Sequence, residues 1–95
     1  MLDAIKDFKV IPDLDKQAAV KILKDGISKL EDKRLFNHLA LTYPPRVRAL
    51  AGALMELLSP KEDLSLLRKS LNPLSNFEFG LNKSILSNSE NWKIS

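Results

Sequence analysis

The stretch 43–58 constrains the fold most, because it is the most apolar run of the sequence and opens with the pair Pro44-Pro45. A residue before proline is pushed out of the α-helical region, so a helix is predicted to end at Tyr43. Pro45 suits the first position of the next helix, where its missing N–H is not needed. That helix is apolar on most sides, so we expect it to lie at the centre of the molecule.

Gly52 lies in the middle of this central helix, between small neighbours at 49, 51 and 53. A run of small residues gives the helix a thin waist, because no bulky side chain separates its backbone from a neighbour. We therefore expect another helix to cross closely at Gly52.

Two segments before the central helix have helical periodicity. Residues 13–30 form the clearest amphipathic helix, with Asp13 or Asp15 available to cap its start. Its apolar stripe comprises Leu14, Ala18, Ile22, Leu23, Ile27 and Leu30. Residues 33 to about 42 form a short second helix. Its apolar stripe comprises Leu35, Phe36, Leu39, Ala40 and Tyr43.

A last helix is predicted after the central one. Ser59-Pro60-Lys61-Glu62 has the pattern of a capping box, in which Ser59 and Glu62 satisfy each other's backbone amides. The helix would run through Leu71 and stop before Asn72-Pro73. At the other end of the chain, residues 1–9 are consistent with one or two helical turns or a frayed end, and Val10-Ile11-Pro12 with an extended segment.

The periodicity changes after Pro73. Residues 74–81 alternate apolar with small or polar residues, as strands do, and Trp92-Lys93-Ile94 alternates again after a turn-rich patch. This ending is either a loose hairpin or two extended arms over the helices. Phe77, Phe79 and Trp92 are large enough to anchor it, since burying one contributes roughly 2–3 kcal/mol.

Together these patterns predict a mainly α fold, a small bundle of about four helices with a short extended or β-hairpin C-terminal segment. The 95 residues suggest a single helical domain, 1–95. Within it we expect an N-terminal lead-in at 1–12, a helical core at 13–71 and an extended C-terminal arm at 72–95.

The charge balance is only mildly basic, with 15 basic and 12 acidic residues. It permits nucleic-acid or acidic partners but favours neither. A row of lysines on the 13–30 helix is either a solvated face or a phosphate-contacting stripe. The row comprises Lys16, Lys21, Lys24 and Lys29.

Location and membrane contact follow from the residue types that are present. Without cysteine, disulfides are excluded and a reducing cytoplasm is the simpler location. The segment 2–10 is interrupted by charges, so no signal peptide is expected. The longest apolar run, 49–55, falls far short of the ~20 residues of a membrane span, so no membrane association is expected.

No catalytic pattern is present, and we expect neither enzymatic activity nor a cofactor or metal. The carboxylate pairs Asp13/Asp15 and Glu62/Asp63 lie at helix starts, where capping accounts for them. His38 has no cysteine or second histidine to complete a ligand set, so we interpret it as a partly exposed helix residue.

Arg46 and Arg48 are unusual, because the first turn of a helix disfavours cations. They either pair with Glu31 or Asp32, or form a partner-binding patch with Tyr43, since arginine and tyrosine are common binding anchors. Tyr43, Arg46 and Arg48 are therefore the candidate partner-binding residues.

Three segments of the sequence together resemble one known family. The run 43–56, YPPRVRALAGALME, resembles its PPxxRALLGAxLE signature, with Ala51 in place of a leucine. The run 70–75, SLNPLS, resembles its SLNPLT segment, followed at 77–81 by the place of its YxxGL-like run. The run 91–94, NWKI, resembles its closing W-N-I element. The family is that of the AbiEi-like antitoxins of type IV toxin–antitoxin systems, in the branch of bacterial transcriptional regulators.

The resemblance implies the C-terminal domain of such a regulator, either as part of a longer protein or as a short homologue. Members carry an N-terminal winged helix-turn-helix that binds their own promoter, and no counterpart precedes Asp13. In the family this C-terminal domain opposes a nucleotidyltransferase-like toxin, by acting on the toxin or on its target. A stable complex with the toxin is not required.

Two alternatives remain beside the antitoxin role. One is a nucleic-acid-binding accessory module, supported by the net charge of +3 and the lysine row. The other is a dimerisation module that uses leftover apolar surface of the 50–58 helix or of the aromatic tail.

Overall fold

The computed structural model describes residues 2–6, 16–81 and 83–95. Its helices are α1 (Leu2–Lys6), α2 (Lys16–Ser28), α3 (Lys33–Ala40), α4 (Pro45–Leu58), α5 (Ser65–Lys69) and the 3₁₀ helix η3 (Ser89–Trp92). The described part of the chain is mainly helical and has no β-sheet, so the predicted small helical bundle is confirmed.

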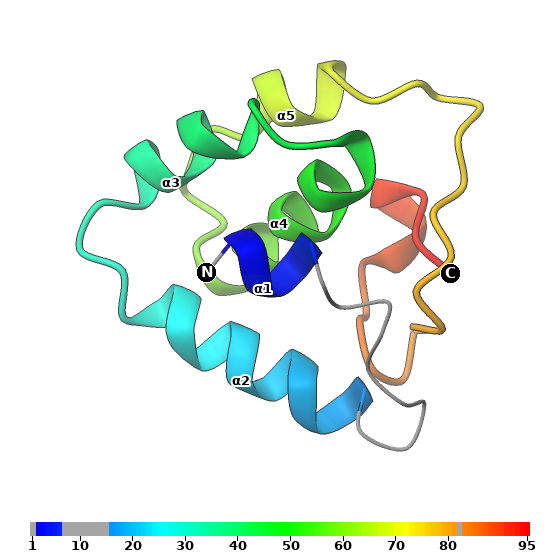
Figure 1. Ribbon diagram of the computed structural model, residues 1–95, viewed down its shortest axis with the longest axis horizontal. Coiled ribbons are helices and arrows are strands. Elements are labelled where there is room, and N and C mark those ends of the chain that lie inside the picture. Colours follow the sequence, from blue (N-terminus) through cyan, green and yellow to red (C-terminus); the bar gives the residue numbers. More distant parts are fainter. Residues whose placement is uncertain (1, 7–15, 82) are drawn as a thin grey trace.

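Helix α4 lies at the centre, as its apolar sequence predicts (Figure 1). All the extensive contacts between described helices involve α4, which packs against α1, α2, α3, α5 and η3. It begins at Pro45, and Val47 and residues 49–55 are buried. A helix surrounded in this way buries apolar side chains on all its sides, and this accounts for the absence of charge between Arg48 and Glu56.

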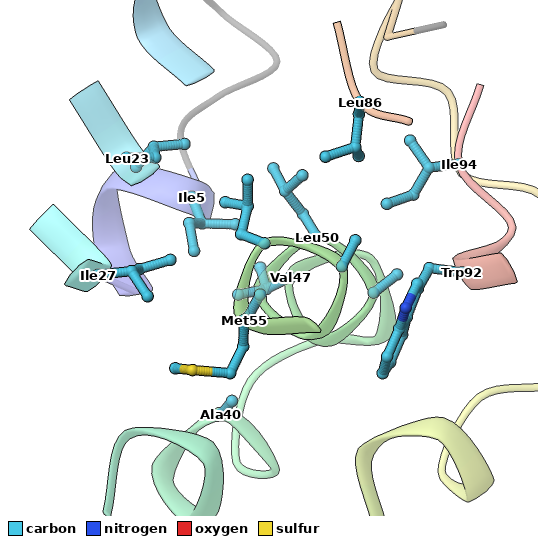
Figure 2. Close-up of a cluster of buried hydrophobic side chains, with 14 of the residues drawn as sticks. Ile5, Leu23, Ile27, Ala40, Val47, Leu50, Met55, Leu86, Trp92 and Ile94 are labelled. Carbon is cyan, nitrogen blue, oxygen red and sulfur yellow. The ribbon is translucent and has the colours of Figure 1, made fainter. Parts of the chain in front are cut away.

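The core forms where the other elements press apolar side chains onto α4 (Figure 2). On one side lie Ile5 of α1 and Leu23 and Ile27 of α2, and on the other lie Leu86, Trp92 and Ile94. The C-terminal arm therefore completes the same core as the helices and does not lie over it as a separate layer.

The close approach predicted at Gly52 is made by an aromatic ring. A Cβ atom placed on Gly52 would lie 2.2 Å from Cζ3 of Trp92, whose side chain is fully buried. Real Cβ atoms do not approach so closely, so glycine is the residue that lets the indole ring lie against the α4 backbone.

The apolar stripes predicted for α2 and α3 are partly wrong. On α2 the buried residues are Val20, Leu23 and Ile27, whereas Ala18 is exposed and Ile22 is 70% exposed. Successive helical residues are about 100° apart, and α4 covers only a narrow stripe of this helix. On α3, Phe36 and Ala40 are buried, but Leu35 and Leu39 are 53% and 47% exposed. The eight-residue α3 likewise packs extensively only on α4, which leaves one flank uncovered.

The capping box predicted at residues 59–62 is also wrong. Ser59 instead ends α4, with its N–H bound to the carbonyl of Met55 at 2.7 Å, and residues 59–62 form a turn. The N–H of Glu62 bonds the backbone carbonyl of Ser59 at 3.0 Å. Helix α5 starts only at Ser65, where Asp63 Oδ1 accepts the backbone amide at 3.0 Å and the hydroxyl at 2.7 Å.

The C-terminal segment consists of turns, one isolated bridge and the helix η3, and the predicted hairpin is not confirmed. Phe77 and Ile94 form an isolated parallel bridge, whereas the strands of a hairpin run antiparallel. The bridge includes a bond from the N–H of Phe77 to the carbonyl of Lys93 at 2.6 Å and one from Ser95 to Phe77 at 3.0 Å. The helical turn η3 ends at Trp92, and the chain then returns through Lys93 to place Ile94 beside Phe77.

The predicted caps Asp13 and Asp15 and the extended segment at 10–12 lie outside the described residues. Helix α1 shows that the beginning of the chain belongs to the core, because Ile5 is fully buried against α4. No helix in the described ranges has the length and apolar character needed to cross a membrane.

Replacing Gly52 with alanine tests the approach of the indole ring. We expect Gly52→Ala to lower the free energy of unfolding by about 1–3 kcal/mol, because the new methyl group overpacks the site. Gly26→Ala in α2 is the control, since alanine favours a helix over glycine by about 1 kcal/mol. In urea unfolding, the double variant Gly52→Ala/Trp92→Leu should cost less than the sum of the single changes. Additive costs would show that the ring and Gly52 are not coupled.

Candidate functional site

Tyr43, the first candidate partner-binding residue, is half-buried at the turn between α3 and α4. Its hydroxyl donates a hydrogen bond to Asp3 Oδ1 at 3.1 Å. This bond to the carboxylate, with burial and the negative charge of Asp3, raises the pKa of Tyr43 above its usual value. Tyr43 thus joins the turn to α1.

Arg46 lies in the first turn of α4 and stacks on an aromatic ring. Its guanidinium carbon is 4.7 Å from the centre of the Phe79 ring, within the range of a cation–π interaction. Its Nε atom is buried without a hydrogen-bond partner among the described residues. Arg46 therefore attaches the C-terminal arm to the start of α4.

Arg48 reaches a third segment. Its Nη1 donates to the backbone carbonyl of Ser70 at 3.3 Å, at the C-terminal end of α5. In the described ranges neither Arg46 nor Arg48 forms the ion pair with Glu31 or Asp32 that was one alternative. A carbonyl and an aromatic ring take the place of the carboxylates as partners of the two cations.

The three candidates thus reach three different segments of the chain. Each has an intramolecular contact that helps to hold a segment around α4. Binding of an outside partner by Tyr43, Arg46 and Arg48 stays a prediction.

A polar cluster that sequence reasoning missed lies near the other end of α4. Asn88 Nδ2 donates to the carbonyl of Ala53 at 2.9 Å and to Glu56 Oε1 at 2.8 Å. Glu56 also forms an ion pair with Arg68, whose guanidinium carbon lies 4.9 Å from the centre of the Trp92 ring. The sequence signal was Glu56, a single acidic residue on an otherwise apolar stretch; its partners are distant in sequence.

The environment of Glu56 favours its ionised form. Burial alone would raise the pKa of Glu56, but the hydrogen bond from Asn88 and the charge of Arg68 act in the opposite direction. The indole N–H of Trp92 acts in the same direction. Together these groups lower the pKa of Glu56 below its usual value.

A groove of about 640 Å³ lies between α3 and α5. Its lining residues are Asp32, Arg34, Leu35, Asn37, His38, Leu41, Glu62, Asp63, Leu66 and Leu67. The apolar stripe predicts Leu35 in the core and the capping pattern assigns Glu62 to a helix start, so the sequence does not indicate this groove. His38 is exposed, as predicted, and lines the groove.

The lysine row on α2 is divided between different environments. Lys29 pairs with Asp25 at 3.0 Å, whereas Lys21 and Lys24 line a depression with Ser84 and Ile85. The described residues bring no third basic side chain into that depression. A nucleic-acid contact here stays a prediction.

The dimerisation surface expected from the 50–58 helix and the aromatic tail is largely used inside the molecule. Leu50, Leu54 and Trp92 have no exposed surface. The exposed Leu35 of α3 and Leu66 of α5 lie at the groove instead. Within the described ranges, no three histidine or acidic side chains come together as a metal site would require.

No family model, curated protein or solved structure matches this chain. The resemblance described from the sequence therefore rests on the residues alone.

The lowered pKa of Glu56 gives a pH-dependent contribution to stability. In the folded state the pKa lies below its unfolded value, so the contribution is complete above the usual carboxyl range and is lost as the pH falls through the folded pKa. We expect Glu56→Gln to be less stable than the parent near pH 7, and this difference to shrink between about pH 5 and 3. Thermal unfolding across that range measures it, with the exposed Glu78→Gln as control. A difference independent of pH would contradict the assignment.

The contacts of Arg46 and Arg48 predict that both stabilise the fold. We expect Arg46→Ala and Arg48→Ala each to lower the free energy of unfolding by about 1 kcal/mol, through loss of a cation–π contact and of a hydrogen bond to a carbonyl. Arg34→Ala, on the exposed surface of α3, is the control for charge. Charge reversal of both residues with unchanged stability but lost partner binding would favour the binding patch instead.

Proposed function

We propose that this chain is a non-enzymatic, antitoxin-type domain of a bacterial type IV toxin–antitoxin regulator that counteracts a nucleotidyltransferase-like toxin. The observation that carries the proposal is the contact between the three segments that resemble the family. Gly52 of the first segment packs against Trp92 of the third, and Arg48 of the first bonds the Ser70 carbonyl of the second.

This meeting of segments supports the resemblance for a physical reason. Short matches scattered along a chain arise easily by chance, but chance does not require the matched residues to contact one another. Here the Trp92 ring needs glycine at position 52, and Arg48, one turn earlier on α4, bonds the Ser70 carbonyl. The three segments therefore meet on one helix, as expected of a single structural module.

In this proposal the chain acts by binding and carries no catalytic group. Two of the groove carboxylates already have structural partners: Asp32 accepts the amide of Leu35 at 2.9 Å, and Asp63 binds Ser65. The domain would act in the cytoplasm on the toxin or on the toxin's target. Promoter binding would belong to a winged-helix domain outside this chain.

Rescue of growth tests the proposal. We expect co-expression of this chain with the neighbouring nucleotidyltransferase-like toxin to relieve growth arrest, because antitoxicity resides in this domain. Gly52→Leu should lose the rescue, since its side chain would displace the Trp92 ring from α4, whereas the surface variant Ile22→Ser, outside the three segments, should keep it. Circular dichroism and soluble yield give the folded state of each variant.

Two outcomes would contradict the proposal. One is arrest that persists while the chain accumulates in a folded state. The other is full rescue by Gly52→Leu in an unfolded state, which would separate the activity from the packing of the segments.

A further inference from the structure

The groove between α3 and α5 combines apolar walls with an acidic rim. Leu66 is 65% exposed and Leu35 53% exposed, although both are large apolar side chains in helices. Asp32, Glu62 and Asp63 also line the groove. Exposed leucines beside charged residues in a concave surface are typical of sites that bind another protein.

Asn37 is a second, independent feature of this groove. Its side chain lines the groove and is only 8% exposed, yet its Oδ1 has no hydrogen-bond partner among the described residues. A buried polar atom without a partner costs free energy, so its retention calls for an explanation. Oδ1 has no exposed surface, so a bound segment would pair with it once the Asn37 side chain turns into the groove.

The charge of the groove is opposite to that of the chain as a whole. Three carboxylates and one arginine line it, whereas the chain has a net charge of +3. The bonds from the hydroxyl and amide of Ser65, with a smaller effect of the charge of Lys69, lower the pKa of Asp63, so this carboxylate stays ionised well below neutral pH. A positively charged partner is therefore favoured at this surface.

We propose that the α3–α5 groove binds a cationic amphipathic helix of a partner protein. Leucine-type side chains on one face of that helix would contact Leu35 and Leu66, and lysines or arginines beside them would meet Asp32, Glu62 and Asp63. Helices bind grooves through apolar anchors spaced three and four residues apart, and this spacing places the flanking cations along the rim. The proposal does not depend on the antitoxin role.

Binding of a designed helical peptide tests the groove. The probe is a 16-residue peptide with leucines at i, i+4, i+7 and i+11 and lysines beside them, titrated into the ¹⁵N-labelled 95-residue chain. We expect chemical-shift changes to cluster at α3, α5 and residues 62–64. The same peptide with glutamate for lysine should bind at least tenfold more weakly, because its charges repel the rim.

Variants of the chain separate the apolar and the charged contributions. Leu66→Ser should weaken binding about tenfold, whereas Leu74→Ser, a 92% exposed leucine away from the groove, should leave it unchanged. Glu62→Lys should weaken binding severalfold, and the exposed Glu78→Lys, which changes the net charge equally, should not. Asn37→Leu should weaken binding while its thermal midpoint does not fall, since it removes an unpaired buried atom.

Several results would overturn the proposal. Equal binding of the two peptides, or equal effects of Leu66→Ser and Leu74→Ser, would show that the peptide binds nonspecifically. Shifts at α3 and α5 that follow the chain's own concentration without peptide would make a second copy the occupant. Shifts at these helices on adding a DNA duplex, lost at high salt, would make a nucleic acid the occupant.

Discussion

The packing of the Trp92 ring against the backbone of α4 at Gly52 is the contact on which the C-terminal part of the molecule depends. The indole is fully buried and fills the space that a side chain at position 52 would occupy. Burial of such a ring contributes roughly 2–3 kcal/mol, a large share of the stability of a small domain. It fixes η3 on α4, and the bridge between Phe77 and Ile94 then returns the preceding arm to the core.

Polar groups at the two ends of α4 orient the surrounding elements. Near its end, Glu56 binds Asn88 and Arg68, and Arg68 in turn covers the ring of Trp92. At its beginning, Arg46 stacks on Phe79 and Arg48 bonds the carbonyl of Ser70, and both partners come after α4 in the chain. The apolar middle of α4 supplies most of the burial but little direction, because the hydrophobic effect is non-directional. The directional contacts decide which segment lies where.

The central position of α4 could be predicted because its apolar residues occupy nearly all its sides, and any bundle must then place it inside. The prediction for Ile22 and Leu35 failed because α4 is the one described helix that packs extensively on theirs, and a sequence stripe is wider than the surface that α4 covers. The helix start predicted at Ser59 was wrong because the pattern at residues 59–62 fits a turn as well as a helix start. The groove could not be predicted for a related reason, because the leucines that line it have the spacing of core residues in the sequence.

The sequence by itself determined the helical class, the break at Pro44 and Pro45 and the start of α4. These follow from local backbone sterics and from the period of apolar residues, which act within one or two helical turns. Only the tertiary structure decided that Trp92 occupies the space at Gly52, that Asn88 satisfies Glu56, and that α3 and α5 leave a groove between them. Such contacts join residues far apart in the chain, and their partners depend on how the other helices pack.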